Sequence, residues 1–339
     1  MGNGKTDRLI ELVENGIGNY VKTHREAKGY LQKEICDGIC SVPTLSRIEA
    51  GEKLVDFLMI EAFLSRMKIE RAEYEFVLDD EDYYAYKRRE EIEARVKNRE
   101  HEQAEKSMAA YESRYGAEEL QGQFLAFQRA LLERAKPRPE WKKARELFTS
   151  ALEATAPEHR KKFEQREILS NLELSCIAEI IYCMEDPVEQ EKEYGELYAY
   201  FTWNCRREDF FPLSYRAAMQ YYAECLYKNG KYERCVRICD EVLKELFRTS
   251  KAENRDEVFL LRAKAREGKG LRTEEERLLC IKDYLTAYHM ICFYGGEARA
   301  EALKQYIGGN TDGSISIRRY GPHEEGSPGD DAGRIGSDI

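Results

Sequence analysis

The chain has 339 residues, of which 42% are hydrophobic and 35% charged, and its net charge is −10. This hydrophobic content excludes a wholly disordered chain, and the length allows one large or two medium domains with real cores. The negative charge argues against nucleic-acid binding through the whole surface, although one locally basic face would still permit it. Abundant Glu, Lys, Arg, Leu and Ala and only eight prolines favour an all-α fold.

The sequence has no long apolar segment. The longest stretch without Asp, Glu, Lys or Arg near an expected helix, residues 284–296, is too short to span a bilayer, and no apolar leader precedes the first expected helix. We therefore expect a cytoplasmic protein with no membrane partner. Ten cysteines in a reducing compartment are most simply packed thiols, and we expect no metal and no cofactor.

The first 70 residues are predicted to form a four- or five-helix domain. Apolar spacing and the intervening glycines indicate helices at about 17–28, 31–36, 41–50 and 56–69.

Within this domain, residues 31–51 have the pattern of two short helices joined by a tight turn. Gly38 accepts the positive φ that the turn needs, and Ser41 is a good N-cap for the second helix. Pro43 is tolerated in the first turn of that helix, and Gly51 is placed to end it. This pattern predicts a helix-turn-helix.

Two cysteines flank the turn, and they have two interpretations. Cys36 and Cys40 could form a metal or redox pair, or they could be packed thiols. No further Cys or His lies nearby at ligand spacing, so we favour packed thiols.

After residue 70 the composition changes to a charged helix. Residues 71–115 are predicted to hold a linker helix and the first repeat, with Tyr83, Tyr86, Ile92 and Val96 as the buried stripe of the linker helix.

Residues 116–307 read as amphipathic helices with short breaks, spaced like helix hairpins of about 35–45 residues. One pattern occurs twice, starting at Trp141 and at Tyr232: an aromatic residue is followed by small or apolar residues three, seven and ten positions later. The helix at 274–295 keeps a looser stripe that includes Leu278 and Leu285. We therefore predict an α-solenoid of about five tetratricopeptide-like helix hairpins, followed by a disordered, glycine-rich tail at 308–339.

The segment "LQKEICDGICSVPTLSRIEAGE" resembles the helix-turn-helix of the Xre/Cro class. The chain places this segment before a predicted solenoid. In this order of parts it is similar to the RRNPP family of peptide-pheromone-controlled regulators. The resemblance covers almost the whole chain and implies a helix-turn-helix domain at 1–70. It implies that the second helix contacts phosphate and that the next helix reads bases in the major groove. The candidate DNA-binding residues are Gln32, Lys33, Ser41, Val42, Pro43, Thr44, Arg47 and Lys53.

The solenoid offers a concave surface that suits an extended peptide, because amide and charged side chains can pair with peptide backbone and termini. The repeat register and the resemblance give these candidate peptide-binding residues: Arg129, Asn171, Arg216, Gln220, Glu224 and Lys264.

These patterns predict a homodimeric transcriptional regulator that binds a double-stranded DNA operator and is controlled by a short signalling peptide, as in quorum sensing. One alternative is a helix-turn-helix regulator whose solenoid binds a protein partner. An enzyme is disfavoured, because the sequence has no paired carboxylates, nucleophile–base set or phosphate loop.

Overall fold

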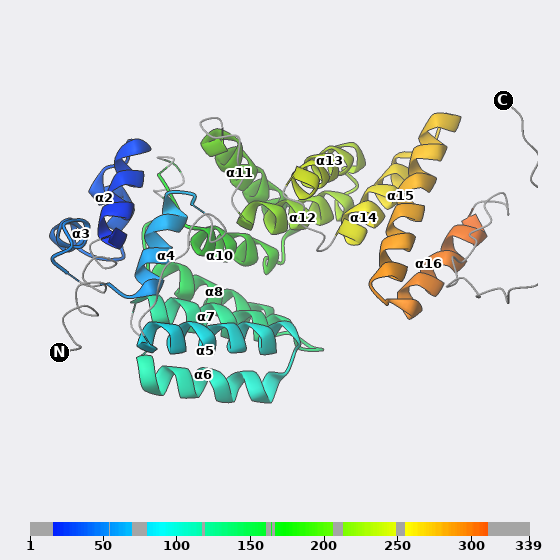
Figure 1. Cartoon of the computed structure of the whole chain (residues 1–339). Helices are drawn as coiled ribbons and strands as arrows, with labels where there is room; N and C mark the ends of the chain where they lie inside the picture. Colours follow the sequence, from blue (N-terminus) through cyan, green and yellow to red (C-terminus); the bar gives the residue numbers. More distant parts are fainter. Residues whose placement is uncertain are drawn as a thin grey trace, which may run out of the picture.

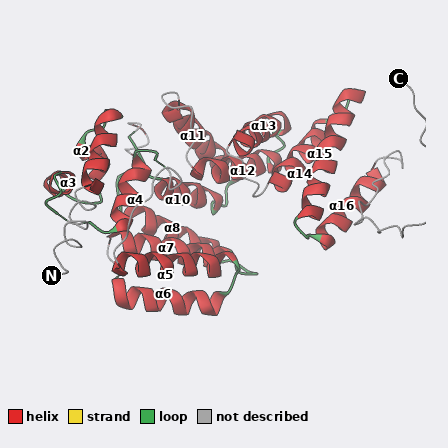
Figure 2. Ribbon diagram, in the orientation of Figure 1, coloured by secondary structure: helices red, strands yellow, loops and turns green. Residues whose placement is uncertain are grey.

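The computed structural model describes residues 16–53, 55–69, 80–116, 119–160, 164, 167–205, 213–248 and 255–310. These residues form α-helices joined by turns and loops and include no strand (Figure 2). The all-α prediction is therefore confirmed. Of the predicted tail, only residues 308–310 are described, and they belong to the last helix, α16 (Glu297–Asn310).

The described part of the N-terminal unit consists of four helices around one apolar cluster. They are residues 16–27, α2 (Gln32–Cys36), α3 (Val42–Glu49) and α4 (Phe57–Arg66). The cluster contains the fully buried side chains Val21, Ile35, Leu45, Ile48, Phe63 and Leu64. The helices lie within a residue or two of the predicted ones, except that α4 ends three residues early.

The charged segment forms α5 (Asp80–Lys97), which pairs with α6 (His101–Tyr115). Ile92 and Val96 are buried on α5, as predicted. The predicted burial of Tyr83 is wrong, because this ring is 49% exposed. Arg89 is buried instead, and its guanidinium donates to the Tyr111 hydroxyl at 3.0 Å.

Paired helices follow one another from the N-terminal unit to α16 (Figure 1). The pairs after α5–α6 are α7 (Glu119–Arg134) with α8 (Trp141–Glu153), α10 (Asn171–Tyr182) with α11 (Pro187–Cys205), α12 (Leu213–Lys228) with α13 (Tyr232–Arg248), and α14 (Arg255–Lys269) with α15 (Glu274–Phe293). The prediction of about five hairpins is therefore confirmed.

The repeat pattern identifies the packing face of two second helices correctly. Every position three, seven and ten residues after Trp141 and Tyr232 is at most 1% exposed: Ala144, Phe148, Ala151, Cys235, Cys239 and Val242. The predicted stripe on α15 is wrong at Leu278, which is 58% exposed. Tyr288, also expected in that stripe, is buried, and the rest of the buried face of α15 runs through Cys280, Tyr284, Ala287 and Ile291.

Candidate functional site

The turn and cap chemistry expected for the helix-turn-helix is present around α3. Gly38 and Gly51 have φ of +75° and +72°, values that glycine adopts at little cost. The Ser41 hydroxyl accepts a hydrogen bond from the Thr44 backbone N–H at 3.2 Å, and Pro43 lies in the first turn. The start of α3 is therefore fixed by its own residues.

The N-terminal tip and one side of α3 are open to solvent. Val42, Pro43 and Arg47 are exposed, whereas Leu45 and Ile48 are buried in the apolar cluster. No described residue forms an ion pair with Arg47. Of the residues predicted to read bases, Val42, Pro43 and Arg47 thus lie on an accessible surface, and Thr44 is half-buried beside them.

Glu49, at the end of α3, joins three helices of the unit. Its carboxylate accepts two hydrogen bonds from Arg25, at 2.6 and 2.9 Å, and one from the Gln32 side chain at 2.8 Å. Arg25 also donates to the Tyr30 carbonyl at 3.0 Å. Gln32, a candidate phosphate contact, is therefore held in place from inside the unit. From the sequence, Glu49 was not identified as a structural residue. The one sequence feature that could have indicated its burial is its position directly after Ile48, which faces inward.

The other candidates near the turn fall into two groups. Lys33 and Lys53 are exposed and can reach a phosphate. Cys36 is buried and Cys40 half-buried; both are free thiols, and burial raises the pKa of Cys36. Among the described residues, no group of three or more His, Cys, Asp or Glu side chains could hold a metal ion.

A buried charge network joins the N-terminal unit to the paired helices. Arg66, fully buried at the end of α4, donates to the carbonyls of Ile35 and Asp37 in its own unit, at 3.0 and 2.6 Å. It also donates to Glu173 of α10 at 2.6 Å and to the Thr155 carbonyl at 3.2 Å. One guanidinium thus spans the boundary between the two parts of the chain.

Glu173 is held on the far side of this contact. Its carboxylate accepts from the Thr155 hydroxyl at 2.8 Å and from the Ser170 backbone N–H at 2.6 Å. Burial opposes ionisation of Glu173, but the charge and hydrogen bonds of Arg66, with those of Ser170 and Thr155, bring its pKa below the ordinary value. The carboxylate is therefore charged at neutral pH.

Two further contacts tighten the same boundary. A Cβ on Gly38 would lie 2.0 Å from the Thr155 carbonyl oxygen, so only glycine allows this approach. The Asn171 backbone N–H donates to the Ser65 hydroxyl at 2.8 Å, and α4 lies beside α10 in Figure 1. The turn of the helix-turn-helix is therefore packed against Thr155, just after α8, and α4 is packed against the start of α10.

Three of the predicted peptide-binding residues form a stripe on α12. Arg216, Gln220 and Glu224 are spaced by four residues and are all half-buried, so they share one helix face. Gln220 donates to Glu257 of α14 at 3.0 Å, and burial raises the pKa of Glu224. Lys264 is exposed on α14.

Arg129 and Asn171 lie away from this stripe. Arg129 forms an ion pair with Glu112 of α6. The backbone N–H of Asn171 bonds Ser65 at the boundary described above, and its side-chain oxygen accepts from the Ser214 hydroxyl at 3.3 Å. The structure therefore does not bring these two residues together with the stripe.

A cluster missed by the sequence reading lies beside the stripe. Arg134 of α7 donates to Glu179 of α10 at 2.6 Å and to the Tyr221 hydroxyl of α12 at 2.9 Å. Its guanidinium lies 5.3 Å from the ring centre of Tyr182 and 5.5 Å from that of Tyr221. This cluster ties the first helices of three hairpins together.

A cavity of about 250 Å³ opens next to this cluster. It is lined by Trp141, Tyr182, Met184, Glu185, Pro187, Gln190, Tyr221, Glu224, Cys225, Lys228 and Asn229. Glu224 belongs both to the stripe and to the cavity. We call the stripe and this cavity together the α12 groove; it offers aromatic faces and charges of both signs.

No described helix is long and apolar enough to cross a membrane. No protein-family model and no curated protein matches the sequence.

Solved structures of helical regulators are similar to the chain at low sequence identity. PlcR of Bacillus thuringiensis, in complex with the peptide PapR7 and DNA, is 15% identical over 85% of this chain and 98% of PlcR, with a TM-score of 0.49. ComR of S. thermophilus, in complex with DNA and its signalling peptide, is 16% identical over 86% of this chain and 98% of ComR, with a TM-score of 0.45. Rgg2, an SHP pheromone receptor of Streptococcus dysgalactiae, is 10% identical over 87% of this chain and 99% of Rgg2, with a TM-score of 0.35.

Proposed function

We propose that the protein is a cytoplasmic, homodimeric, sequence-specific transcriptional regulator of the RRNPP type, controlled by a short signalling peptide. The observation that carries the proposal is the accessible, capped α3 in a unit that is joined to the paired helices by Arg66. Such a unit can present a helix to DNA while the rest of the chain controls its placement.

The DNA contacts follow from the exposure of α3. Arg47 is long, exposed and able to bond a guanine edge, whereas Val42 and Pro43 offer only apolar contact. Ser41 and Thr44 lie at the same tip, and Gln32, Lys33 and Lys53 supply phosphate contacts around it. Residues 1–70 hold ten Lys and Arg against eleven Asp and Glu, so affinity depends on this local face and on two copies binding together.

The peptide is assigned to the α12 groove. An extended peptide needs partners for its backbone amides, its termini and its side chains. Gln220 supplies an amide, Arg216 and Glu224 supply charges of both signs, and the adjacent cavity supplies aromatic faces. Arg129, Asn171 and Lys264 lie outside this arrangement or at its edge, and their peptide contacts remain predictions.

The two sites are connected through α10. The helix carries Glu173 at the boundary with the N-terminal unit and Glu179 and Tyr182 beside the α12 groove. A peptide that binds only one position of α10 would therefore also favour one placement of the helix-turn-helix.

The DNA part is tested by selecting a binding site from a randomised duplex pool and measuring affinity for it. Arg47→Ala should weaken specific binding by about 1–3 kcal/mol and leave binding to random DNA much less affected. Lys142→Ala, an exposed charge on α8, is the matched control and should behave as wild type. An unchanged ratio of specific to random affinity in Arg47→Ala would overturn the assigned docking.

A further inference from the structure

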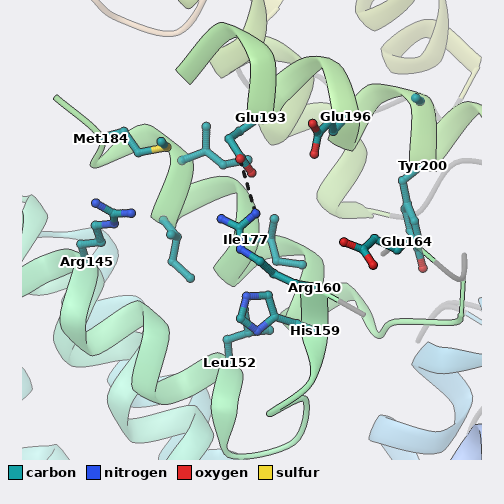
Figure 3. A pocket seen from close by; sticks show the side chains of 13 residues that line it. Arg145, Leu152, His159, Arg160, Glu164, Ile177, Met184, Glu193, Glu196 and Tyr200 are labelled. Atoms are coloured by element: carbon teal, nitrogen blue, oxygen red, sulfur yellow. Dashed lines mark hydrogen bonds and ion pairs between the residues drawn. The ribbon is translucent and has the colours of Figure 1, made fainter. Parts of the chain in front are cut away.

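A second cavity, of about 290 Å³, lies between α8, α10 and α11 (Figure 3). Leu152 of α8 and Ile177, Ile180 and Ile181 of α10 give it an apolar floor, and Met184 lies at one end. The volume is close to the lower limit for small-molecule sites, roughly 300 Å³.

This cavity and the α12 groove use opposite faces of α10. Ile177 and Ile181 line the cavity, whereas Glu179 bonds Arg134 toward the α12 groove. Residues two positions apart on an α-helix point about 200° apart, so the two sites lie on different faces of α10. They share only Met184, which follows α10 and lines both.

Charges of opposite sign lie on its two walls (Figure 3). On α8, Arg145 is exposed, and no described residue forms an ion pair with it. On α11, the side chain of Glu193 is 17% exposed and is paired only loosely with Arg160, at 3.4 Å. Glu196, one turn further along α11, adds a second carboxylate, at 3.8 Å from Lys192. The lining thus holds two arginines and three glutamates, Arg145, Arg160, Glu164, Glu193 and Glu196, above an apolar floor, and Arg160 is already paired with Glu193.

One ring nitrogen at the cavity has no hydrogen-bond partner among the residues that the structure describes. His159 lines the cavity, and its Nδ1 is buried without a hydrogen bond to any described residue. Burial lowers the pKa of His159, so the ring is neutral near pH 7 and can exchange a hydrogen bond with an uncharged amide.

We propose that this cavity binds a free dipeptide with large aliphatic side chains. The ligand carboxylate would pair with Arg145, its ammonium with Glu193 or Glu196, and its side chains would cover the isoleucine floor. A single amino acid carries both charges on one carbon, whereas Arg145 and Glu196 belong to different helices, α8 and α11. The peptide group of a dipeptide separates the charges and gives His159 a partner.

The walls of the cavity are continuous with the boundary that holds the N-terminal unit. Thr155, which contacts Gly38 and Arg66, and His159 lie in the same connection between α8 and α10. Glu173 and Ile177 lie one turn apart on α10. A bound dipeptide therefore contacts the elements that place the helix-turn-helix, and any effect on DNA affinity rests on the function proposed above.

Calorimetric titration of the full chain with Leu-Leu tests the site without DNA or signalling peptide. We expect saturable binding that weakens roughly tenfold or more for N-acetyl-Leu-Leu and for Leu-Leu amide, each of which lacks one charge. Arg145→Gln and Glu196→Gln should have similar effects, and Ala199→Phe should block the exposed mouth. Lys142→Gln, also on α8, should bind as wild type.

Absence of saturable Leu-Leu binding, or binding that is indifferent to both charge variants, would overturn the proposal. Free leucine binding as tightly as Leu-Leu would overturn the assignment to a dipeptide. Since the readout is binding alone, a failure here leaves the assignments to DNA and to the α12 groove untouched. Failure of those assignments leaves this site equally untouched.

Discussion

The N-terminal unit has two working surfaces that are built in opposite ways. On the α3 side, Val42, Pro43 and Arg47 are exposed to solvent. On the α10 side, Arg66 is fully buried, and its two terminal nitrogens make two hydrogen bonds within the unit and two across the boundary, to Thr155 and Glu173. The surface assigned to DNA is therefore anchored to the paired helices through Arg66. Its placement is set by a contact more than 100 residues away in sequence.

The largest expected effect comes from breaking the buried pair. Arg66→Met leaves the Glu173 carboxylate buried without its main partner, which should cost about 3–5 kcal/mol of stability. Urea unfolding measures this loss. The double variant Arg66→Met, Glu173→Gln should lose less than Arg66→Met alone, since no buried charge is left unpaired; equal losses would contradict the role given to the pair.

A smaller effect is expected from the close approach at the turn. Gly38→Ala adds a methyl group 2.0 Å from the Thr155 oxygen and also strains a positive φ. Gly29 is a matched control, because its φ is +73° but a Cβ there would meet nothing within 4 Å. Gly29→Ala should cost about 1–2 kcal/mol from backbone strain alone, and Gly38→Ala should cost more. Equal unfolding midpoints would show that the boundary is open in solution.

On the α3 side, one glycine sets how closely the first helix packs. A Cβ on Gly18 would lie 1.9 Å from the Ile48 carbonyl oxygen, so Gly18→Ala should cost about 1–3 kcal/mol by forcing the helices apart. Gly16→Ala, in open space on the same helix, should cause no loss. Thermal unfolding of the two variants distinguishes this packing from a general intolerance of alanine.

The smallest effect is a pH dependence of the closed contact. The pKa of Glu173 is lowered below its ordinary value of 4.5 in the folded chain. The stability that Glu173 contributes is therefore fully present above that value and is lost as the pH falls from it through the folded pKa. Comparing urea midpoints at neutral and acidic pH, Glu173→Gln should show a smaller acid-induced loss than wild type; an identical loss would assign the acid sensitivity to other groups.

The two surfaces also differ in how much of them the sequence predicts. The turn at Gly38 and the cap at Ser41 are local, so a few neighbouring residues specify them. The Arg66–Glu173 pair joins residues 107 positions apart, and no periodicity connects them. On α7 the sequence reading chose Arg129, yet Arg134, five residues later, faces α10 and α12. The predictions of buried apolar stripes are least accurate in charged or long helices, as the exposed Tyr83 and Leu278 show. Such helices offer several apolar faces, and the sequence alone does not indicate which one is buried.

The proposed control of DNA binding by α3 depends on a peptide bound to the paired helices. Its most direct test is the affinity of the full chain for its selected DNA site, measured while short synthetic peptides, including those encoded beside the gene, are titrated. We expect one peptide to change the DNA affinity of the wild type. We expect Glu224→Gln, in the α12 groove, to weaken this response without altering peptide-free DNA binding. A DNA affinity that stays constant with every such peptide would contradict the proposed control.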